Sequence, residues 1–140
     1  MPVNKILIVD DEKIIVRLLS MSLKSDGYTV VSAYSGEEGL EVFQSELPEI
    51  IITDIKMPGM DGFMTLRAIK TLYPPVEVIL LTGHATMDSA IEGLQFGAFD
   101  YVMKPADISD IVNKAYEAFE KRQRIEGKTM GNEPRKTDLN

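Results

Sequence analysis

The chain has 140 residues, a length that fits one domain, and 44% of them are hydrophobic, which is enough for a sizeable core. It contains no cysteine, which excludes a disulfide framework and a thiolate metal site. No apolar run approaches the roughly 20 residues that span a bilayer, and the N-terminal residues lack the layout of a signal peptide. We therefore expect a soluble, cytoplasmic protein without a membrane role.

The net charge of −7 at neutral pH is unevenly distributed along the chain. Residues 121–140 carry six Lys or Arg against three acidic residues, so the rest of the chain has a net charge of −10. Phosphate contacts require clustered cations, which argues against direct nucleic-acid binding by this acidic part. The basic segment is short and mixed in sign, and such segments are usually solvated.

Strand-like and helix-like hydrophobic patterns alternate along the chain. The runs of strand length are Lys5–Val9, Thr29–Ala33, Ile50–Thr53, Val76–Thr82 and Asp100–Met103. Apolar residues recur at helical spacing over Ile14–Leu23, Leu40–Leu47, Phe63–Tyr73, Met87–Leu94 and Ile108–Phe119. The first four of these helical segments are each followed by a glycine or proline that ends them: Gly27, Pro48, Pro74 and Gly97.

This order of elements predicts an α/β fold. The first, third and fourth strands are apolar throughout, as expected where helices cover both faces of a parallel sheet. The prediction is a three-layer (βα)5 sandwich with a doubly wound parallel sheet and right-handed crossovers, and the pattern alone does not fix the strand order. After about Arg124 the apolar period fades. We therefore expect a domain over residues 1–122 and a polar flexible tail or linker over residues 123–140.

Polar side chains follow four of the predicted strands at their carboxyl ends, where ligands bind in open parallel sheets. They are Asp10 and Asp11 after the first strand, Asp54 after the third, Thr82 after the fourth and Lys104 after the fifth. The first and third strands are neighbours in the common five-stranded order. In that order, three carboxylates, a hydroxyl and an ammonium group meet at one edge of the sheet.

This combination of groups predicts phosphoryl transfer assisted by a metal ion. Three carboxylates repel one another, and a hard divalent cation offsets that repulsion. Mg²⁺ takes oxygen ligands and keeps several waters, so one or two carboxylates and a phosphate oxygen suit it. Lys104 supplies a charge, and Thr82 a hydroxyl, for the phosphoryl oxygens. Asp54 is a competent nucleophile toward phosphorus because carboxylates form acyl phosphates.

Each polar residue also has an ordinary structural interpretation. Asp10 or Asp11 could cap the helix that follows, and Thr82 could be a plain strand-end threonine. Asp61 is more simply an N-cap of the next helix, and His84, the only histidine, is more simply a loop residue. The joint placement of five polar residues at the ends of four strands favours the functional interpretation.

Four motifs, taken together, resemble the receiver domain of two-component response regulators. They read ILIVDDE, IITDIKMPGMDG, LLTGHA and GAFDYVMKP, and the resemblance covers residues 4 to about 121. It implies a flavodoxin-like fold with strand order 2-1-3-4-5. It also implies a phosphorylation-controlled switch rather than an enzyme, although such a domain catalyses its own phosphorylation and autodephosphorylation.

We call the edge of the sheet that carries Asp10, Asp11, Asp54, Thr82 and Lys104 the acidic edge. The resemblance implies a role for each of these residues. Asp54 is the implied phosphoacceptor. The implied metal is Mg²⁺, for which Mn²⁺ can substitute. Its implied ligands are Asp11, Asp54 and the backbone carbonyl of Lys56, and Asp10 acts mostly through a metal-bound water. The side chains of Lys56 and His84 are implied to tune the lifetime of the phosphoryl group.

The same resemblance implies how the signal leaves the site. Thr82 and Lys104 bind the phosphoryl oxygens, and Thr82 and Tyr101 form a switch that changes the surface of the fourth helix, fifth strand and fifth helix. The Lys104–Pro105 peptide is implied to be cis, which aims the lysine at the site. The implied phosphodonor is a sensor histidine kinase or a phosphotransfer protein, and the sequence does not name the downstream target. We expect a monomer or a weak, phosphorylation-dependent dimer.

Three alternatives are consistent with parts of this pattern. A haloacid-dehalogenase-type phosphatase requires a second aspartate two residues after the nucleophile, where this chain has Lys56. A flavin carrier requires a Ser/Thr/Gly-rich phosphate loop after the first strand, where this chain reads VDDEK. The third is the receiver fragment of a larger, ATPase-type transcription activator, which the segment from Thr82 to Pro105 resembles.

Overall fold

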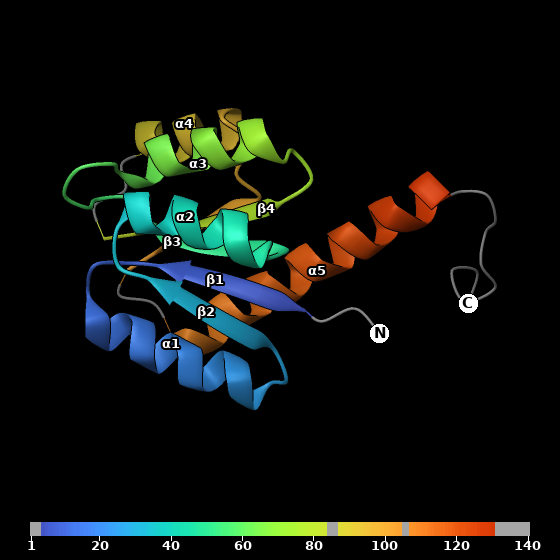
Figure 1. The fold of residues 1–140 in the computed structure, drawn as a ribbon, viewed down its shortest axis with the longest axis horizontal. Helices are drawn as coiled ribbons and strands as arrows, with labels where there is room; N and C mark the ends of the chain where they lie inside the picture. Colours follow the sequence, from blue (N-terminus) through green and yellow to red (C-terminus); the bar gives the residue numbers. More distant parts are fainter. Residues whose placement is uncertain (1–3, 84–86, 105–106, 131–140) are drawn as a thin grey trace.

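The computed structural model describes residues 4–83, 87–104 and 107–130, with side chains for residues 4–83, 91–104 and 107–124. Five strands and five helices alternate within these ranges (Figure 1). The strands are β1 (Lys5–Val9), β2 (Thr29–Ala33), β3 (Ile50–Asp54), β4 (Glu77–Thr82) and β5 (Asp100–Met103). The helices are α1 (Lys13–Ser25), α2 (Gly36–Glu46), α3 (Gly62–Leu72), α4 (Met87–Gln95) and α5 (Ile108–Met130). The alternation predicted from the hydrophobic pattern is confirmed.

The five strands form one parallel sheet in the order β2-β1-β3-β4-β5. Its register pairs Val9 with Thr53 and Asp54 with Leu81. The carboxyl ends of β1, β3 and β4 therefore lie next to one another at one edge of the sheet. This order confirms the flavodoxin-like α/β fold and places the ends of the two strands that carry Asp10 and Asp54 side by side.

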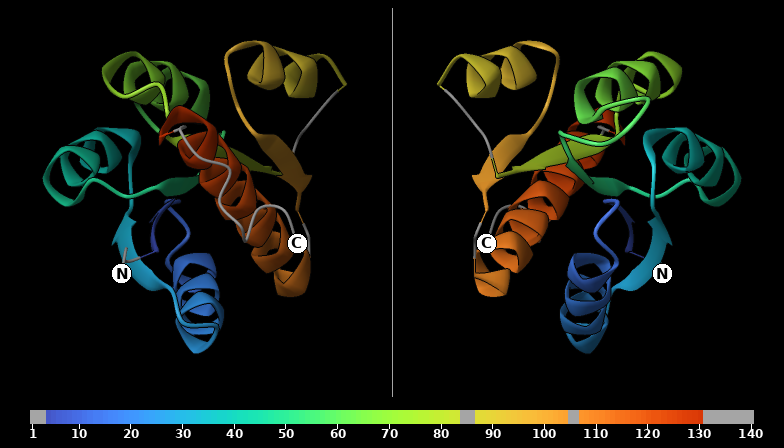
Figure 2. Two further views of the ribbon diagram at one scale, coloured as in Figure 1. Left: turned by 90° about the vertical axis from the view of Figure 1, so that its right-hand side faces the viewer. Right: turned by 90° about the vertical axis from the view of Figure 1, so that its left-hand side faces the viewer.

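Helices cover both faces of the sheet, as Figure 2 shows: α1 and α5 lie on one face, and α2, α3 and α4 lie on the other. Successive residues of a strand point to opposite faces of the sheet, so they pack alternately in one helical layer and the other. Ile52 packs in the core that α1 and α5 close, whereas its neighbour Ile51 packs in the core that α2 and α3 close. Because both faces are covered, β3 and β4 are buried along their whole length.

The helices next to the acidic edge have well-defined starts. Ser35 caps α2, and its hydroxyl accepts a hydrogen bond of 3.0 Å from the N–H of Glu38. Asp61 caps α3, and its Oδ1 accepts a hydrogen bond of 2.9 Å from the N–H of Met64. The interpretation of Asp61 as an N-cap is confirmed, and both caps fix where α2 and α3 begin relative to the loop after β3.

Helix α5 continues beyond the point at which the apolar pattern fades. It runs to Met130, so the first part of the predicted tail, residues 123–130, is helical. Lys121 and Arg122 attach the helix to the segment before and at the start of β4: Lys121 Nζ lies 3.2 Å from Oε2 of Glu77, and Arg122 Nη1 donates to the carbonyl of Pro75 at 2.6 Å. The domain boundary at residue 122 stays a prediction. No helix in the described part of the chain is both long and apolar enough to cross a membrane.

Candidate functional site

The turn after β1 buries Asp10 beneath two acidic neighbours at the surface. Asp10 is fully buried, and its Oδ1 accepts a hydrogen bond of 2.9 Å from the N–H of Glu12. The N–H of Asp10 donates in turn to the carbonyl of Ala33 at the end of β2. The N-cap of α1 is Glu12, whose side chain makes no capping bond, so the alternative of Asp10 or Asp11 as the cap is wrong. The Asp10 carboxylate is thereby held facing the end of the sheet.

Lys104, just after β5, lies among three carboxylates. Its Nζ is 2.7 Å from Oε1 of Glu12, 3.0 Å from Oδ2 of Asp10 and 3.5 Å from Oδ2 of Asp54. Its N–H donates to the carbonyl of Thr82 at 2.6 Å, which holds the residue beside the end of β4. The strands thus bring together Asp10, Asp54 and Lys104, as the positions of these residues at the strand ends predict.

At this edge three carboxylates, two of them buried, face one lysine. The pKa of Asp54 is raised to about 6, mainly by burial and then by the charge of Asp10, against the lowering effect of Lys104. Burial also raises the pKa of Asp10, although the N–H of Glu12 and the charge of Lys104 oppose it. Burial alone would lower the pKa of Lys104, but the carboxylates of Glu12, Asp10 and Asp54 raise it above its usual value. One lysine therefore does not neutralise the carboxylates.

The donor set at this edge fits a hard divalent cation. Asp10, Glu12 and Asp54 each offer a carboxylate oxygen, and the three oxygens lie within 4.8 Å of one another. Oδ2 of Asp10 is buried and pairs with Nζ of Lys104 at 3.0 Å. A carboxylate oxygen has more than one lone pair, so Oδ2 can also accept a hydrogen bond from a metal-bound water. Oxygen ligands of this kind are those that Mg²⁺ prefers.

Glu12 was not among the residues predicted for the site, although it directly follows the two aspartates in the run VDDE. The run itself was the available signal, but only the fold shows that this long side chain turns back to Lys104. Asp11 is exposed and lies outside the group of three carboxylates. Its predicted role as a metal ligand stays a prediction, as does that of the Lys56 carbonyl.

A cavity of about 580 Å³ opens between the loop that follows Asp54 and the end of β4. Its lining residues are Ile55, Lys56, Met57, Pro58, Gly59, Asp61, Phe63 and Thr82. Thr82 is almost fully buried there, whereas the Lys56 side chain is exposed. Phe63, one of the lining residues, packs edge-on against Phe96, with 6.4 Å between ring centroids. The cavity is large enough for a phosphoryl group and several waters.

Of the other residues predicted for the site, the structure describes Tyr101 but not His84 or Pro105. Tyr101 on β5 is half-buried and packs against the core on the face of α2 and α3. Register pairs it with Leu80, two residues before Thr82 in β4. His84 and Pro105 lie outside the described residues, and so does the predicted cis peptide between Lys104 and Pro105. The roles of these residues stay predictions.

The sequence matches the family described as the response regulator receiver domain over residues 6–116. The chain belongs to this family. Receiver domains are the phosphoaccepting switches of two-component systems: they take phosphoryl groups from histidine kinases and bind Mg²⁺ in an acidic pocket. The acidic edge built by β1, β3 and β5 is the corresponding region of this receiver.

Solved structures of receivers share its fold. A response regulator receiver domain from Clostridium thermocellum is 37% identical with a TM-score of 0.83, and covers 88% of this chain and 99% of that one. A receiver domain from Methanospirillum hungatei, described as CheY-like, is 32% identical with a TM-score of 0.84, and covers 88% of this chain and 98% of that one.

Longer proteins are also similar to this receiver. The DNA-binding transcriptional regulator NtrC of Escherichia coli is 36% identical over 136 residues, which are 95% of this chain and 27% of NtrC. The regulatory protein AtoC of Escherichia coli is 38% identical over 109 residues, which are 78% of this chain and 24% of AtoC. This receiver thus spans about a quarter of the length of the curated relatives that it matches.

Proposed function

We propose that Asp54 is the phosphoacceptor and that a histidine kinase or phosphotransfer protein is the donor. The observation that carries the proposal is the position of Asp54 at the end of β3, 3.5 Å from the ammonium of Lys104, in a chain of the receiver family. Asp54 is buried and faces a second buried carboxylate, Asp10. A divalent cation bound at this edge would relieve the repulsion between them.

The proposed reaction is an in-line displacement. A carboxylate oxygen of Asp54 attacks the phosphorus, the bond from phosphorus to the donor histidine nitrogen breaks, and that nitrogen leaves with the electron pair. Lys104 exchanges a carboxylate partner for a phosphoryl oxygen, and the Thr82 hydroxyl donates to another. Asp10, Asp11, Asp54 and the Lys56 carbonyl would hold Mg²⁺, which neutralises the charge that the transferred group carries. The same residues support catalysis of both phosphorylation and slow autodephosphorylation by the domain itself.

We infer that the donor protein docks over α1. Three apolar side chains at helical spacing are exposed on this helix: Ile14 by 73%, Leu18 by 45% and Met21 by 62%. Beside them lies a groove of about 500 Å³, lined by Glu12, Ile15, Leu18, Leu19, Leu81, Gly83, Lys104, Ile108 and Ile111. Because Glu12 and Lys104 also belong to the acidic edge, a protein that reaches Asp54 from this side covers the apolar stripe.

Intact-mass spectrometry tests the phosphoacceptor. Incubation with a small phosphodonor should add one phosphoryl mass to the parent in the presence of Mg²⁺ and much more slowly without it. The Asp54→Asn variant should gain none, because the amide is not a nucleophile toward phosphorus. Asp26→Asn, a matched change at an exposed aspartate after α1, should behave as the parent does. Equal gain of mass by the Asp54→Asn variant would show that another residue accepts the phosphoryl group.

A more specific candidate is that this receiver controls a transcriptional regulator. The relatives that favour it are NtrC and AtoC, which are about four times as long as the matched part. Replacing Asp54 by Asn in the chromosomal gene should then change a defined set of transcripts. An unchanged transcript profile under conditions in which the parent is phosphorylated would contradict this candidate.

A further inference from the structure

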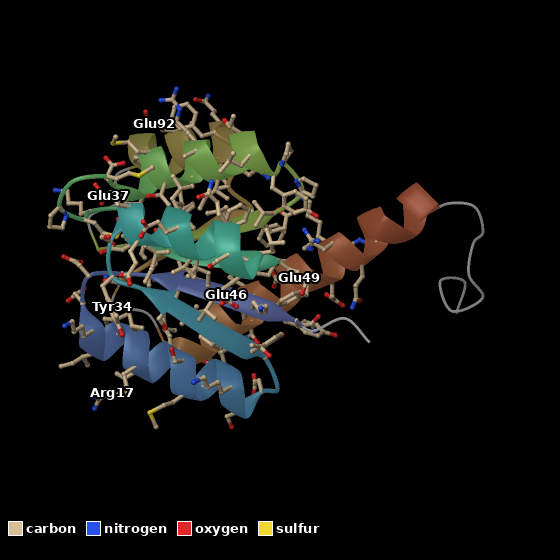
Figure 3. All side chains as sticks on the ribbon, in the orientation of Figure 1. Arg17, Tyr34, Glu37, Glu46, Glu49 and Glu92 are labelled. Carbon is tan, nitrogen blue, oxygen red and sulfur yellow. The ribbon has the colours of Figure 1, made fainter. Side chains whose placement is uncertain are left out.

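The loop after β3 is held by a side chain from the first turn of α2. Oε2 of Glu37 accepts a hydrogen bond of 3.0 Å from the N–H of Met60, a residue 23 positions further along the chain. Figure 3 labels Glu37 at the start of α2, on the side of the molecule where the loop before α3 runs. Glu37 belongs to α2, so this hydrogen bond ties the loop to a helix that precedes it in the chain.

Two glycines allow this close contact. Gly36 lies against the loop so tightly that an added Cβ would collide with the carbonyl oxygen of Met60. Gly59 has a φ of +75°, and an added Cβ would lie only 2.7 Å from Oε2 of Glu37. The Gly36–Glu37 turn and the Gly59–Met60 peptide therefore fit each other closely, and the contact is part of the fold rather than a chance meeting of surface side chains.

The ends of the loop are fixed by contacts of their own. The N–H of Gly62 donates to the carbonyl of Ile55 at 2.8 Å, and the side chain of Met57 is almost fully buried. Between these two anchors, the Glu37 carboxylate holds the middle of the loop at Met60. Lys56, whose carbonyl is the expected metal ligand, lies in the same short loop, four residues before Met60.

We propose that Glu37 is a positioning residue of the metal site: by holding Met60, it keeps the Lys56 carbonyl directed at the acidic edge. The inference rests on the proposed function, because it takes that carbonyl as a ligand. Groups that orient metal ligands change metal affinity by about 10- to 100-fold when they are lost. Glu37 acts through four residues of backbone, so we expect an effect at the lower limit, roughly tenfold.

Three variants separate the effect of the hydrogen bond to Met60 from the effect of the negative charge of Glu37. They are Glu37→Ala, Glu37→Gln and Glu41→Ala. Glu37→Gln removes the charge but keeps an oxygen that accepts from Met60, whereas Glu37→Ala removes both. Glu41→Ala removes an equal charge one turn further along α2, where the side chain is exposed. Calorimetric titration with MgCl₂ measures affinity without phosphorylation, and amide hydrogen exchange at Met60 reports on the bond itself.

We expect Glu37→Ala to lose protection at Met60 and to bind Mg²⁺ roughly tenfold more weakly. Glu37→Gln should retain most of both, and Glu41→Ala should match the parent. Parent-like Mg²⁺ affinity in Glu37→Ala would overturn the proposal. So would equal weakening in Glu37→Gln, or in Glu41→Ala, because the effect would then be one of charge. If the parent itself bound no Mg²⁺ or gained no phosphoryl mass, the proposed function would fail instead, which is a separate result.

Discussion

Glu12 and Lys104 form the shortest ion pair described at the acidic edge. Oε1 of Glu12 lies 2.7 Å from Nζ of Lys104, which is a shorter distance than Nζ makes to either buried aspartate. The Glu12 side chain is 60% exposed. Under the proposed function, a phosphoryl group on Asp54 shares the Lys104 ammonium with Glu12, because an ammonium has three N–H donors. The ion pair with Glu12 therefore weakens the attraction of Lys104 for the phosphoryl group.

Glu12→Gln should for this reason be phosphorylated faster than the parent. Exposed ion pairs contribute about 0–1 kcal/mol, so we expect an increase of about two- to fivefold with a small phosphodonor at saturating Mg²⁺. Rapid-quench mass spectrometry measures the rate, and Glu41→Gln controls for the loss of one negative charge. A slower rate in Glu12→Gln would mean that Glu12 assists the reaction, as a metal ligand would.

The raised pKa of Asp54 predicts how stability depends on pH. Its folded pKa of about 6 lies above the ordinary aspartate value of 3.8, so the folded state binds its proton more tightly than the unfolded state does. The charge of Asp54 therefore destabilises the fold above pH 6, and this cost disappears as the pH falls from 6 toward 4. Without metal, Asp54→Asn should be more stable than the parent by about 1–3 kcal/mol at pH 7, and by little near pH 4. Urea denaturation at several pH values measures the difference.

The same series with MgCl₂ gives the control. A bound cation stabilises the charged carboxylates of the parent, so the difference at pH 7 should shrink or reverse when Mg²⁺ is added. A difference between the two proteins that stays constant from pH 4 to pH 7 would show that the Asp54 charge does not cause it.

Much of the site could be predicted from the sequence because strand ends in a parallel sheet have a defined place. Asp10, Asp54 and Lys104 each follow an apolar run, and the alternation of strands and helices leaves their side chains at one edge. Contacts made by long side chains could not be predicted in this way. Glu12 meets Lys104 across 92 residues, and Glu37 meets Met60 across 23. Both contacts depend on the distance in space between two segments that are far apart in the sequence. The hydrophobic pattern carries no information about that distance.

The end of α5 could not be predicted for a different reason. The apolar period marks only the helical residues that pack on the core, and beyond Arg124 the helix continues to Met130 through a segment that lacks this period. The contacts of Lys121 with Glu77 and of Arg122 with Pro75 mark where the packed part of the helix ends.

Those contacts predict which part of α5 stabilises the domain. Arg122→Ala removes a charged donor that is 93% buried, and should lower the free energy of unfolding by about 2 kcal/mol. Arg124→Ala, at an exposed position, should have little effect, and deletion of residues 127–140 should leave the melting temperature nearly unchanged. Urea and thermal denaturation measure both. A loss of several degrees on deletion would show that the C-terminal segment packs on the body.

The apolar stripe of α1 predicts a difference between protein and small-molecule donors. Ile14→Ser and Leu18→Ser remove exposed apolar side chains next to the groove that reaches Lys104. Transfer from a phosphorylated histidine kinase should slow about tenfold, because a few central apolar contacts carry most of a docking interface. Phosphorylation by a small phosphodonor should not change. Met64→Ser, which removes an exposed methionine on α3, is the control. If both donors slow equally, α1 is not the docking surface.

The last prediction concerns how the phosphoryl group changes the surface. Thr82 is almost fully buried at the end of β4, and Tyr101 is half-buried on the adjacent strand β5. A hydrogen bond from Thr82 to a phosphoryl group on Asp54 should draw the end of β4 toward the acidic edge, and the Tyr101 ring can then turn further inward. This is a two-state element biased by one local charge, and α4, β5 and α5 present the result to a partner.

Thr82→Ala should still accept a phosphoryl group, at a rate up to about tenfold lower, because the hydroxyl is not the nucleophile. Amide shifts with and without a phosphoryl mimic should change along α4 and at Tyr101 in the parent and hardly at all in Thr82→Ala. Equal shift changes in both proteins would show that Thr82 does not couple the site to that surface.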